Sequence, residues 1–156
     1  MEHEKDTGRK RPEPPPRGEN RGGCRHRARI LLAEDDREMR SMLASVLRSD
    51  GYHIIEFSDG LVLLDFIGTV MLNPGPMSRV DVIISDIRMP GWTGLDILAG
   101  MRRAGWSVPF ILITAFGGRD VQEIAGKLGA ATVLNKPFDI DDLRAELLGV
   151  TRQSST

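Results

Sequence analysis

The sequence contains one cysteine, one tyrosine and two tryptophans among 156 residues, and it has no long apolar run. A single cysteine excludes a framework of disulfides and favours a reducing compartment. No segment reaches the roughly 18–20 apolar residues of a membrane-spanning helix, and no early apolar stretch resembles a signal peptide. These absences predict a cytoplasmic protein that does not have a membrane as its partner.

Charge is divided unevenly along the chain. Residues 1–29 carry nine Lys/Arg and five Asp/Glu, whereas the rest carries twelve and seventeen, so a segment of +4 precedes one of −5. Residues 1–28 are rich in Pro, Gly and Arg and have no apolar period, which predicts a disordered basic tail. Two interpretations of this tail are possible. It has no function, or it is a basic segment that binds nucleic acid or an acidic partner. Its lack of aromatics for base stacking disfavours nucleic acid.

After the tail, short apolar runs alternate with helical patterns. The runs are nearly continuous in apolar residues, which is typical of strands buried on both faces of a parallel sheet. They lie at Ile30–Ala33, His53–Phe57, Val80–Ser85, Phe110–Thr114 and Ala131–Leu134. The pattern predicts an α/β fold: a doubly wound, five-stranded parallel sheet with flanking helices, (βα)5, over residues 29–149, followed by a short tail at 150–156.

Helices are expected between the strands. The predicted helical faces are Met39, Met42, Leu43, Val46 and Leu47 in the first helix, Leu95, Leu98 and Met101 in the third, and Val121, Ile124, Ala125 and Leu128 in the fourth. We expect Ser58 to cap the second helix, which runs to about Ile67, and Asp139 to cap the last, which runs to about Leu148. Residues 68–79 are predicted to form a long loop.

Chemically active side chains follow four of the five predicted strands. Glu34 and Asp35 come after the first strand, Asp86 after the third, Thr114 ends the fourth, and Lys136 follows the fifth. Because the carboxyl ends of parallel strands meet at one edge, we expect these residues to share one rim. The second strand contributes nothing comparable, which fits a place at the edge of the sheet.

The residue types at this rim point to phosphoryl transfer. Three neighbouring carboxylates repel one another, and a hard cation such as Mg²⁺ removes that conflict. A carboxylate is also a phosphoryl acceptor, and a lysine and a hydroxyl can hold the phosphoryl oxygens. Taken singly, each residue has an ordinary explanation, such as acids at a helix start or an aspartate in a turn. Their joint placement favours a site.

Four motifs in order resemble the receiver domains of response regulators in two-component signalling, including chemotaxis regulators. They are Ile30-Leu-Leu-Ala-Glu-Asp-Asp, Val82-Ile-Ile-Ser-Asp-Ile-Arg-Met-Pro-Gly with Gly94-Leu95, Ile111-Leu-Ile-Thr-Ala, and Asn135-Lys-Pro-Phe. The resemblance covers about residues 28–149 and implies a flavodoxin-like fold. It also implies specific roles: Asp86 as phosphoacceptor, Asp35 as direct Mg²⁺ ligand with Glu34 as its acidic neighbour, the main-chain carbonyl of Arg88 as a further metal ligand, Thr114 as switch hydroxyl, and Lys136 as the family's lysine. A cis bond between Lys136 and Pro137 is implied as well.

The function implied is that of a stand-alone receiver. A sensor histidine kinase or phosphotransfer protein donates the phosphoryl group to Asp86, and the protein then binds a downstream target or passes the group on in a phosphorelay. Thr114 moves inward and carries the loop at 115–118 with it. We expect no enzyme activity beyond the protein's own phosphorylation and dephosphorylation, and no output domain after the last helix. A homodimer is also compatible with this interpretation.

Two positions depart from the family pattern or add to it. Val133 stands where receivers often carry Tyr or Phe, and valine has no ring whose rotation could couple to the movement of the threonine. Phe116 lies two residues after Thr114, and we hypothesise that it tunes hydrolysis or replaces part of that switch. Asp36 is expected at a helix start rather than in a metal shell. The Arg88 side chain either reaches the entrance of the site or is a solvated surface charge.

Two other functions remain as alternatives. One is a receiver-like scaffold that binds partners without phosphate, which Val133 favours and the intact acidic and basic residues oppose. The other, less favoured, is a Mg²⁺-dependent phosphatase, because the fold alone does not determine the function. The spacing of Glu34, Asp35 and Asp36 does not match the nucleophile motif expected of such an enzyme.

Overall fold

A single parallel sheet forms the centre of the computed structural model, which describes residues 27–153. Its five strands lie in the order β2-β1-β3-β4-β5. The strands are β1 (Arg29–Ala33), β2 (His53–Phe57), β3 (Val82–Asp86), β4 (Phe110–Thr114) and β5 (Thr132–Asn135). The predicted fold class is confirmed, and so is the edge position of the second strand.

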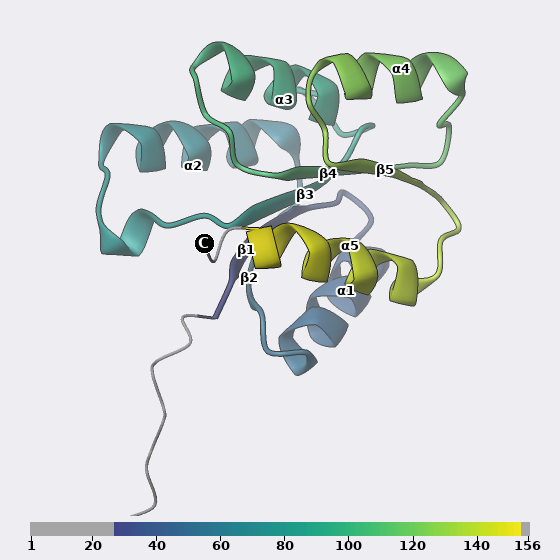
Figure 1. Cartoon of the computed structure of the whole chain (residues 1–156), viewed down its shortest axis with the longest axis horizontal. Helices are drawn as coiled ribbons and strands as arrows, with labels where there is room; N and C mark the ends of the chain where they lie inside the picture. Colours follow the sequence, from purple (N-terminus) through teal and green to yellow (C-terminus); the bar gives the residue numbers. More distant parts are fainter. Residues whose placement is uncertain (1–26, 154–156) are drawn as a thin grey trace, which may run out of the picture.

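Helices cover both faces of the sheet (Figure 1). One layer holds α2 (Gly60–Leu72), α3 (Gly94–Arg103) and α4 (Arg119–Lys127), and the other holds α1 (Arg37–Ser49) and α5 (Ile140–Gln153). Successive residues of one strand point to opposite faces, so Leu31 belongs to the core under α2, α3 and α4, whereas Ile30 belongs to the core under α1 and α5. Burial on both faces explains the nearly continuous apolar runs of the strands.

The start of α1 shows how local chemistry positions the rim. Asp36 is the N-cap, and its side chain accepts hydrogen bonds from the backbone N–H groups of Glu38 at 3.0 Å and Met39 at 3.2 Å. These bonds satisfy donors that a helix leaves unpaired. The prediction that Asp36 belongs to the helix start is confirmed. Glu34 and Asp35 are therefore held in the short turn between β1 and α1.

The second helix differs from its prediction at both ends. Its N-cap is Asp59 rather than Ser58, and the Asp59 carboxylate accepts from the Val62 N–H at 2.9 Å. The helix continues to Leu72, so the first part of the predicted loop at 68–79 is helical. The apolar period supplies the reason, because Val70 is buried one turn beyond the predicted end. A 3₁₀ turn, η1 (Pro76–Ser78), follows before β3.

The predicted boundary at residue 149 falls inside α5. Residues 150–153, predicted as part of a tail, continue the helix to Gln153. Val150 packs against the core, and the Thr151 hydroxyl donates to the Leu147 carbonyl at 2.7 Å, so this last turn is anchored. The predicted tail at 1–28 lies outside the described residues as far as residue 26, and residues 154–156 lie outside them too. Within the described part of the chain, no helix is long and apolar enough to cross a membrane.

Candidate functional site

The acidic pair after β1 is tied to its neighbours by the backbone. The Glu34 N–H donates to the Phe57 carbonyl of β2 at 3.1 Å, and Arg40 donates to the Glu34 carbonyl at 2.7 Å. The Glu34 residue is 1% exposed, whereas Asp35 is exposed. The two adjacent carboxylates therefore have different surroundings: one is held inside the rim and the other faces solvent.

Asp86 is the last residue of β3 and is buried. Its Oδ1 accepts a hydrogen bond from the Arg88 N–H at 3.0 Å, which orients the carboxylate toward the β3–α3 loop. Gly94 begins α3 close by, and a Cβ there would lie 2.6 Å from the Asp86 carbonyl oxygen. The motif's glycine therefore lets α3 start directly against the end of β3.

Lys136 joins the two acidic segments. Its backbone N–H donates to the Thr114 carbonyl at 2.7 Å, which places it beside the end of β4, and its bond to Pro137 is cis, as expected. Its Nζ lies 2.6 Å from Asp86 Oδ2 and 2.9 Å from Glu34 Oε2. One ammonium group thus bridges two carboxylates that lie 50 and 102 residues away from it in the sequence.

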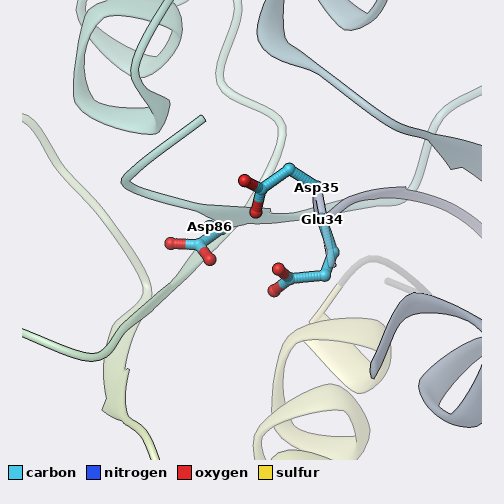
Figure 2. A group of neighbouring side chains, drawn as sticks. All are labelled: Glu34, Asp35 and Asp86. Atoms are coloured by element: carbon cyan, nitrogen blue, oxygen red, sulfur yellow. The ribbon is translucent and has the colours of Figure 1, made fainter. Parts of the chain in front are cut away.

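Three carboxylates converge at this point (Figure 2). Oxygen atoms of Glu34, Asp35 and Asp86 all lie within 4.8 Å of one another, and Figure 2 shows the side chains from the ends of two strands directed toward a common space. Burial raises the pKa of Glu34 to about 7, against the lowering effect of its hydrogen bond from Lys136. Burial lowers the pKa of Lys136, but the hydrogen bonds to Asp86 and Glu34 outweigh it and raise that pKa overall.

This donor set fits a hard divalent cation. When all are ionised, the three carboxylates and Lys136 sum to −2, and the candidate ligand atoms of Glu34, Asp35 and Asp86 are carboxylate oxygens. Mg²⁺ prefers oxygen ligands and needs only one or two carboxylates besides water and phosphate. The backbone of Arg88 also lies at this site through its N–H bond to Asp86. The metal roles of Glu34, Asp35, Asp86 and the Arg88 carbonyl remain predictions.

Thr114 lies at the rim, but its hydroxyl faces its own loop. The residue is 2% exposed, and its Oγ1 accepts a hydrogen bond from the Phe116 N–H at 3.1 Å. Among the described residues, no hydrogen bond joins this hydroxyl to Asp86 or Lys136. The structure therefore brings Glu34, Asp35, Asp86 and Lys136 together directly and leaves Thr114 beside them with its hydroxyl engaged elsewhere.

Arg88 and Phe116 contact each other across the site. The Arg88 guanidinium carbon lies 4.2 Å from the centre of the Phe116 ring, a cation–π geometry, and the ring is 63% exposed. Their backbone N–H groups bond to Asp86 and Thr114 respectively, each within its own loop, so the cation–π contact joins two loops that are each anchored at the end of a strand. Sequence reasoning singled out both residues but did not pair them, since they belong to different loops.

Gly117 and Asn135 were missed by sequence reasoning. A Cβ at Gly117 would overlap Asn135 Oδ1 and lie 2.8 Å from Thr114 Cγ2, so the β4–α4 loop packs closely against β5. The signal was the Gly117-Gly118 pair shortly after a buried strand, which marks a close backbone approach. Val133 lies in β5, opposite Leu112, and packs half-buried against the core.

Comparison with known proteins agrees with this geometry. Residues 30–148 match the response regulator receiver domain. The chain is 32% identical to sporulation initiation phosphotransferase F of Bacillus subtilis over 116 residues, which cover 74% of this chain and 87% of that protein. It is 36% identical to the transcriptional regulatory protein PdtaR of Mycobacterium tuberculosis, of which the match spans 52%. The chain thus spans about half the length of this and other transcriptional regulators it matches.

Solved structures show the same fold. The receiver domain of the Francisella response regulator 1452 aligns with a TM-score of 0.73 at 25% identity, over 82% of this chain and 99% of that one. The Vibrio cholerae chemotaxis protein CheY4 aligns with a TM-score of 0.67 at 26% identity, over 80% of this chain and 98% of that one. The matched family model, the shared fold and the acidic rim lead to one conclusion: the chain belongs to the response regulator receiver domain family and contains a receiver domain of two-component signalling.

Proposed function

We propose that this receiver accepts a phosphoryl group on Asp86 in a Mg²⁺-dependent reaction and signals through its phosphorylated form. The observation that carries the proposal is the buried Asp86 carboxylate, 2.6 Å from the Lys136 ammonium and grouped with Glu34 and Asp35. A carboxylate held this way has a fixed direction of attack and a cation ready beside it, which are the main needs of phosphoryl transfer.

The reaction begins with a donor that carries phosphorus on a histidine nitrogen or in a small acyl phosphate. An Asp86 carboxylate oxygen attacks phosphorus in line, the new O–P bond forms, and the bond to the donor's leaving atom breaks with its electron pair. Lys136 then pairs with a phosphoryl oxygen in place of part of its contact with Asp86. Mg²⁺ held by Glu34, Asp35 and Asp86 would neutralise a further phosphoryl oxygen.

Thr114 supplies the conformational response in this proposal. In the present structure the hydroxyl oxygen of Thr114 accepts the Phe116 N–H, and a phosphoryl group on Asp86 offers a charged acceptor to the O–H of the same hydroxyl. Turning toward the phosphoryl group releases the Phe116 N–H and draws the loop at 115–118 with it. The phosphoryl group thereby shifts the population between two loop arrangements, because it makes contacts in only one of them.

The partners follow from this chemistry. The donor is a sensor histidine kinase or a phosphotransfer protein, and the output is phosphorylation-dependent binding to a downstream protein or onward transfer in a phosphorelay. We propose a stand-alone form, supported by a relative, sporulation initiation phosphotransferase F, of which the match covers 87%. We also propose that the protein catalyses nothing beyond its own phosphorylation and dephosphorylation.

The test is to incubate the purified chain with acetyl phosphate or phosphoramidate and Mg²⁺ and follow its intact mass. One added phosphoryl group is expected, and it should be lost in Asp86→Asn and in the presence of a chelator. Asp65→Asn, on the exposed side of α2, is the matched control and should be phosphorylated normally. An adduct that persists in Asp86→Asn would refute the assignment of the acceptor.

A phosphate-independent scaffold is the second candidate, and Val133 is the observation that favours it. A half-buried valine in β5 has no ring that could follow the threonine inward. If a folded protein takes no phosphoryl group from small donors, transfer from phosphorylated histidine kinases decides between the two functions. Absence of transfer there as well would make the scaffold the better explanation.

A further inference from the structure

The helix α2 has apolar side chains on all sides. Its thirteen residues, GLVLLDFIGTVML, include one charged residue, Asp65. Leu63 and Ile67 are buried in the core, yet Leu61 is 60% exposed and Leu72 is 83% exposed. A helix that is apolar all round is normally covered on all sides. The outward side of α2 therefore has the composition of a buried surface.

Four residues on the outward side of α2 form a regular stripe, of which Leu61, Asp65 and Leu72 are exposed and Gly68 is half-buried. Leu61, Asp65, Gly68 and Leu72 are spaced by four, three and four residues, so they lie along one line of the helix surface. A Cβ added at Gly68 would have no atom within 4 Å, so the middle of the stripe is open. Figure 1 shows α2 at one end of its helical layer, beside α3. The described part of the chain leaves this side of α2 uncovered.

The loop after β3 extends the stripe at its first end. A Cβ at Gly60 would overlap the Trp92 carbonyl oxygen, so this loop rests directly on the start of α2. The Trp92 residue is 46% exposed, and a Cβ at Gly91 of the same loop would lie 3.9 Å from Leu61 Cβ. We call the stripe Leu61–Asp65–Gly68–Leu72, together with Val62, Met71 and Trp92, the outer α2 face.

We propose that the outer α2 face is the contact surface between two copies of this chain, paired antiparallel about a two-fold axis. The spacing of four, three and four residues is the same in both directions, so the stripe matches itself when two copies run in opposite directions. Leu61 of each copy then meets Leu72 of the other. Asp65 of each copy lies opposite Gly68, where the missing side chain leaves room for the carboxylate and its water.

A second copy fits this surface better than a charged partner does. The outer α2 face carries one charge, that of Asp65, so a highly charged partner would lose hydration on contact and find little counter-charge in return. The area buried in the proposed interface limits its affinity. A helix of thirteen residues is about 20 Å long, and with Trp92 the face buries on the order of 500 Å² per copy. That is near the lower limit for specific interfaces, so we expect a dissociation constant on the order of 10–100 µM.

The experiment is analytical ultracentrifugation of the full chain between about 5 and 500 µM, a range that brackets the expected constant. No phosphoryl donor is added, so the result is independent of the proposed function. The average mass of the wild type should rise from monomer to dimer. Leu61→Lys and Leu72→Glu should each weaken association at least about tenfold, because each places charges in an apolar contact.

The decisive part of the experiment tests whether two introduced opposite charges restore association. Antiparallel pairing puts the lysine introduced at position 61 beside the glutamate introduced at position 72. A mixture of the Leu61→Lys and Leu72→Glu proteins, and also the double variant, should therefore associate again. Met42→Glu on α1, where the residue is 49% exposed, is the matched control and should dimerise like the wild type. Circular dichroism melting confirms that each variant is folded.

Three results would overturn the proposal. The wild type could stay monomeric throughout the range, which excludes the dimer. Association could persist in Leu72→Glu, which places the contact elsewhere on the molecule. The single variants could dissociate without recovering in the mixture, which excludes antiparallel pairing of Leu61 with Leu72.

Discussion

Replacing Lys136 with methionine removes the positive charge that contacts two buried carboxylates. The side chain of Glu34 is 1% exposed and that of Asp86 is 7% exposed, so neither charge has full access to water once the ammonium is gone. Methionine keeps the length and most of the apolar stem of lysine. The change therefore tests the charge rather than the packing.

The expected loss of stability follows from this burial. Removing one partner of a buried ion pair costs about 3–5 kcal/mol, because the remaining charge is left uncompensated. The Lys136 side chain keeps 20% exposure, so water reaches the site and the lower figure, about 3 kcal/mol, applies. With a urea m-value of about 1.5 kcal/mol/M for a domain of this size, the unfolding midpoint should fall by about 2 M.

The assay is urea unfolding at pH 8 in a chelator, followed by circular dichroism. At pH 8 Glu34 of the wild type, with a pKa of about 7, is mainly ionised, so its pair with Lys136 is intact. Removing Lys136 also removes the lowering effect of the ammonium on that pKa, so Glu34 of the variant takes up a proton more readily and part of the cost appears in that form. Lys127→Met is the matched control. Its ammonium lies in an exposed pair with Glu123 at 3.5 Å, which contributes less than about 0.5 kcal/mol, so its midpoint should move by less than about 0.3 M.

Magnesium provides a second measurement on the same variant. Without Lys136 the ionised cluster carries one more net negative charge, so Mg²⁺ should raise the midpoint of Lys136→Met more than that of the wild type. Equal midpoints for Lys136→Met and Lys127→Met in chelator would refute the electrostatic account of the site. So would a variant that Mg²⁺ stabilises no more than it stabilises the wild type.

Three further predictions concern neighbouring residues. The pKa of Glu34 is raised from 4.5 to about 7, so the folded state binds this proton more tightly than the unfolded state does. Without metal, the free energy of unfolding measured in urea should therefore fall as pH rises from 4.5 to 7, and Glu34→Gln should make it depend less on pH. A Cβ at Gly117 would overlap Asn135, so Gly117→Ala should lower stability by about 1–3 kcal/mol by thermal unfolding, whereas Gly118→Ala, with open space around it, should not. Phe116→Ala removes a cation–π contact of about 0.5–1 kcal/mol and should change the acyl-phosphate half-life about two- to fivefold in a radiolabel decay assay; an unchanged half-life would contradict a role for this ring.

The local sequence pattern predicted the presence of helices and strands better than it predicted where they begin and end. The strand at His53–Phe57 and the strand at Phe110–Thr114 have the predicted bounds, because a buried strand changes composition sharply at both ends. The α2 helix does not, because Ser58 and Asp59 are both good N-caps and backbone geometry selects between them. Its C-terminal end was misjudged because an apolar helix lacks the polar period that marks a surface helix.

The rim residues were predictable for a topological reason. Strand order and parallel direction bring the carboxyl ends of β1, β3, β4 and β5 to one edge, so residues next to those ends must be neighbours. Sequence reasoning could not supply the pairing within the rim. The contacts of Arg88 with Phe116 and of Gly117 with Asn135 join different loops, and loop paths depend on packing.

The sequence by itself determined the class of fold, the family and the set of chemically active residues, because apolar periodicity and motif order are local properties of the chain. Only the tertiary structure decided that one ammonium bridges Glu34 and Asp86, that the Thr114 hydroxyl is engaged by its own loop, and that α2 exposes an apolar side. For the ammonium bridge, the physical reason is distance along the chain. Contacts between residues 50 or 102 positions apart exist only once the sheet has brought their strands together, and no local pattern records them.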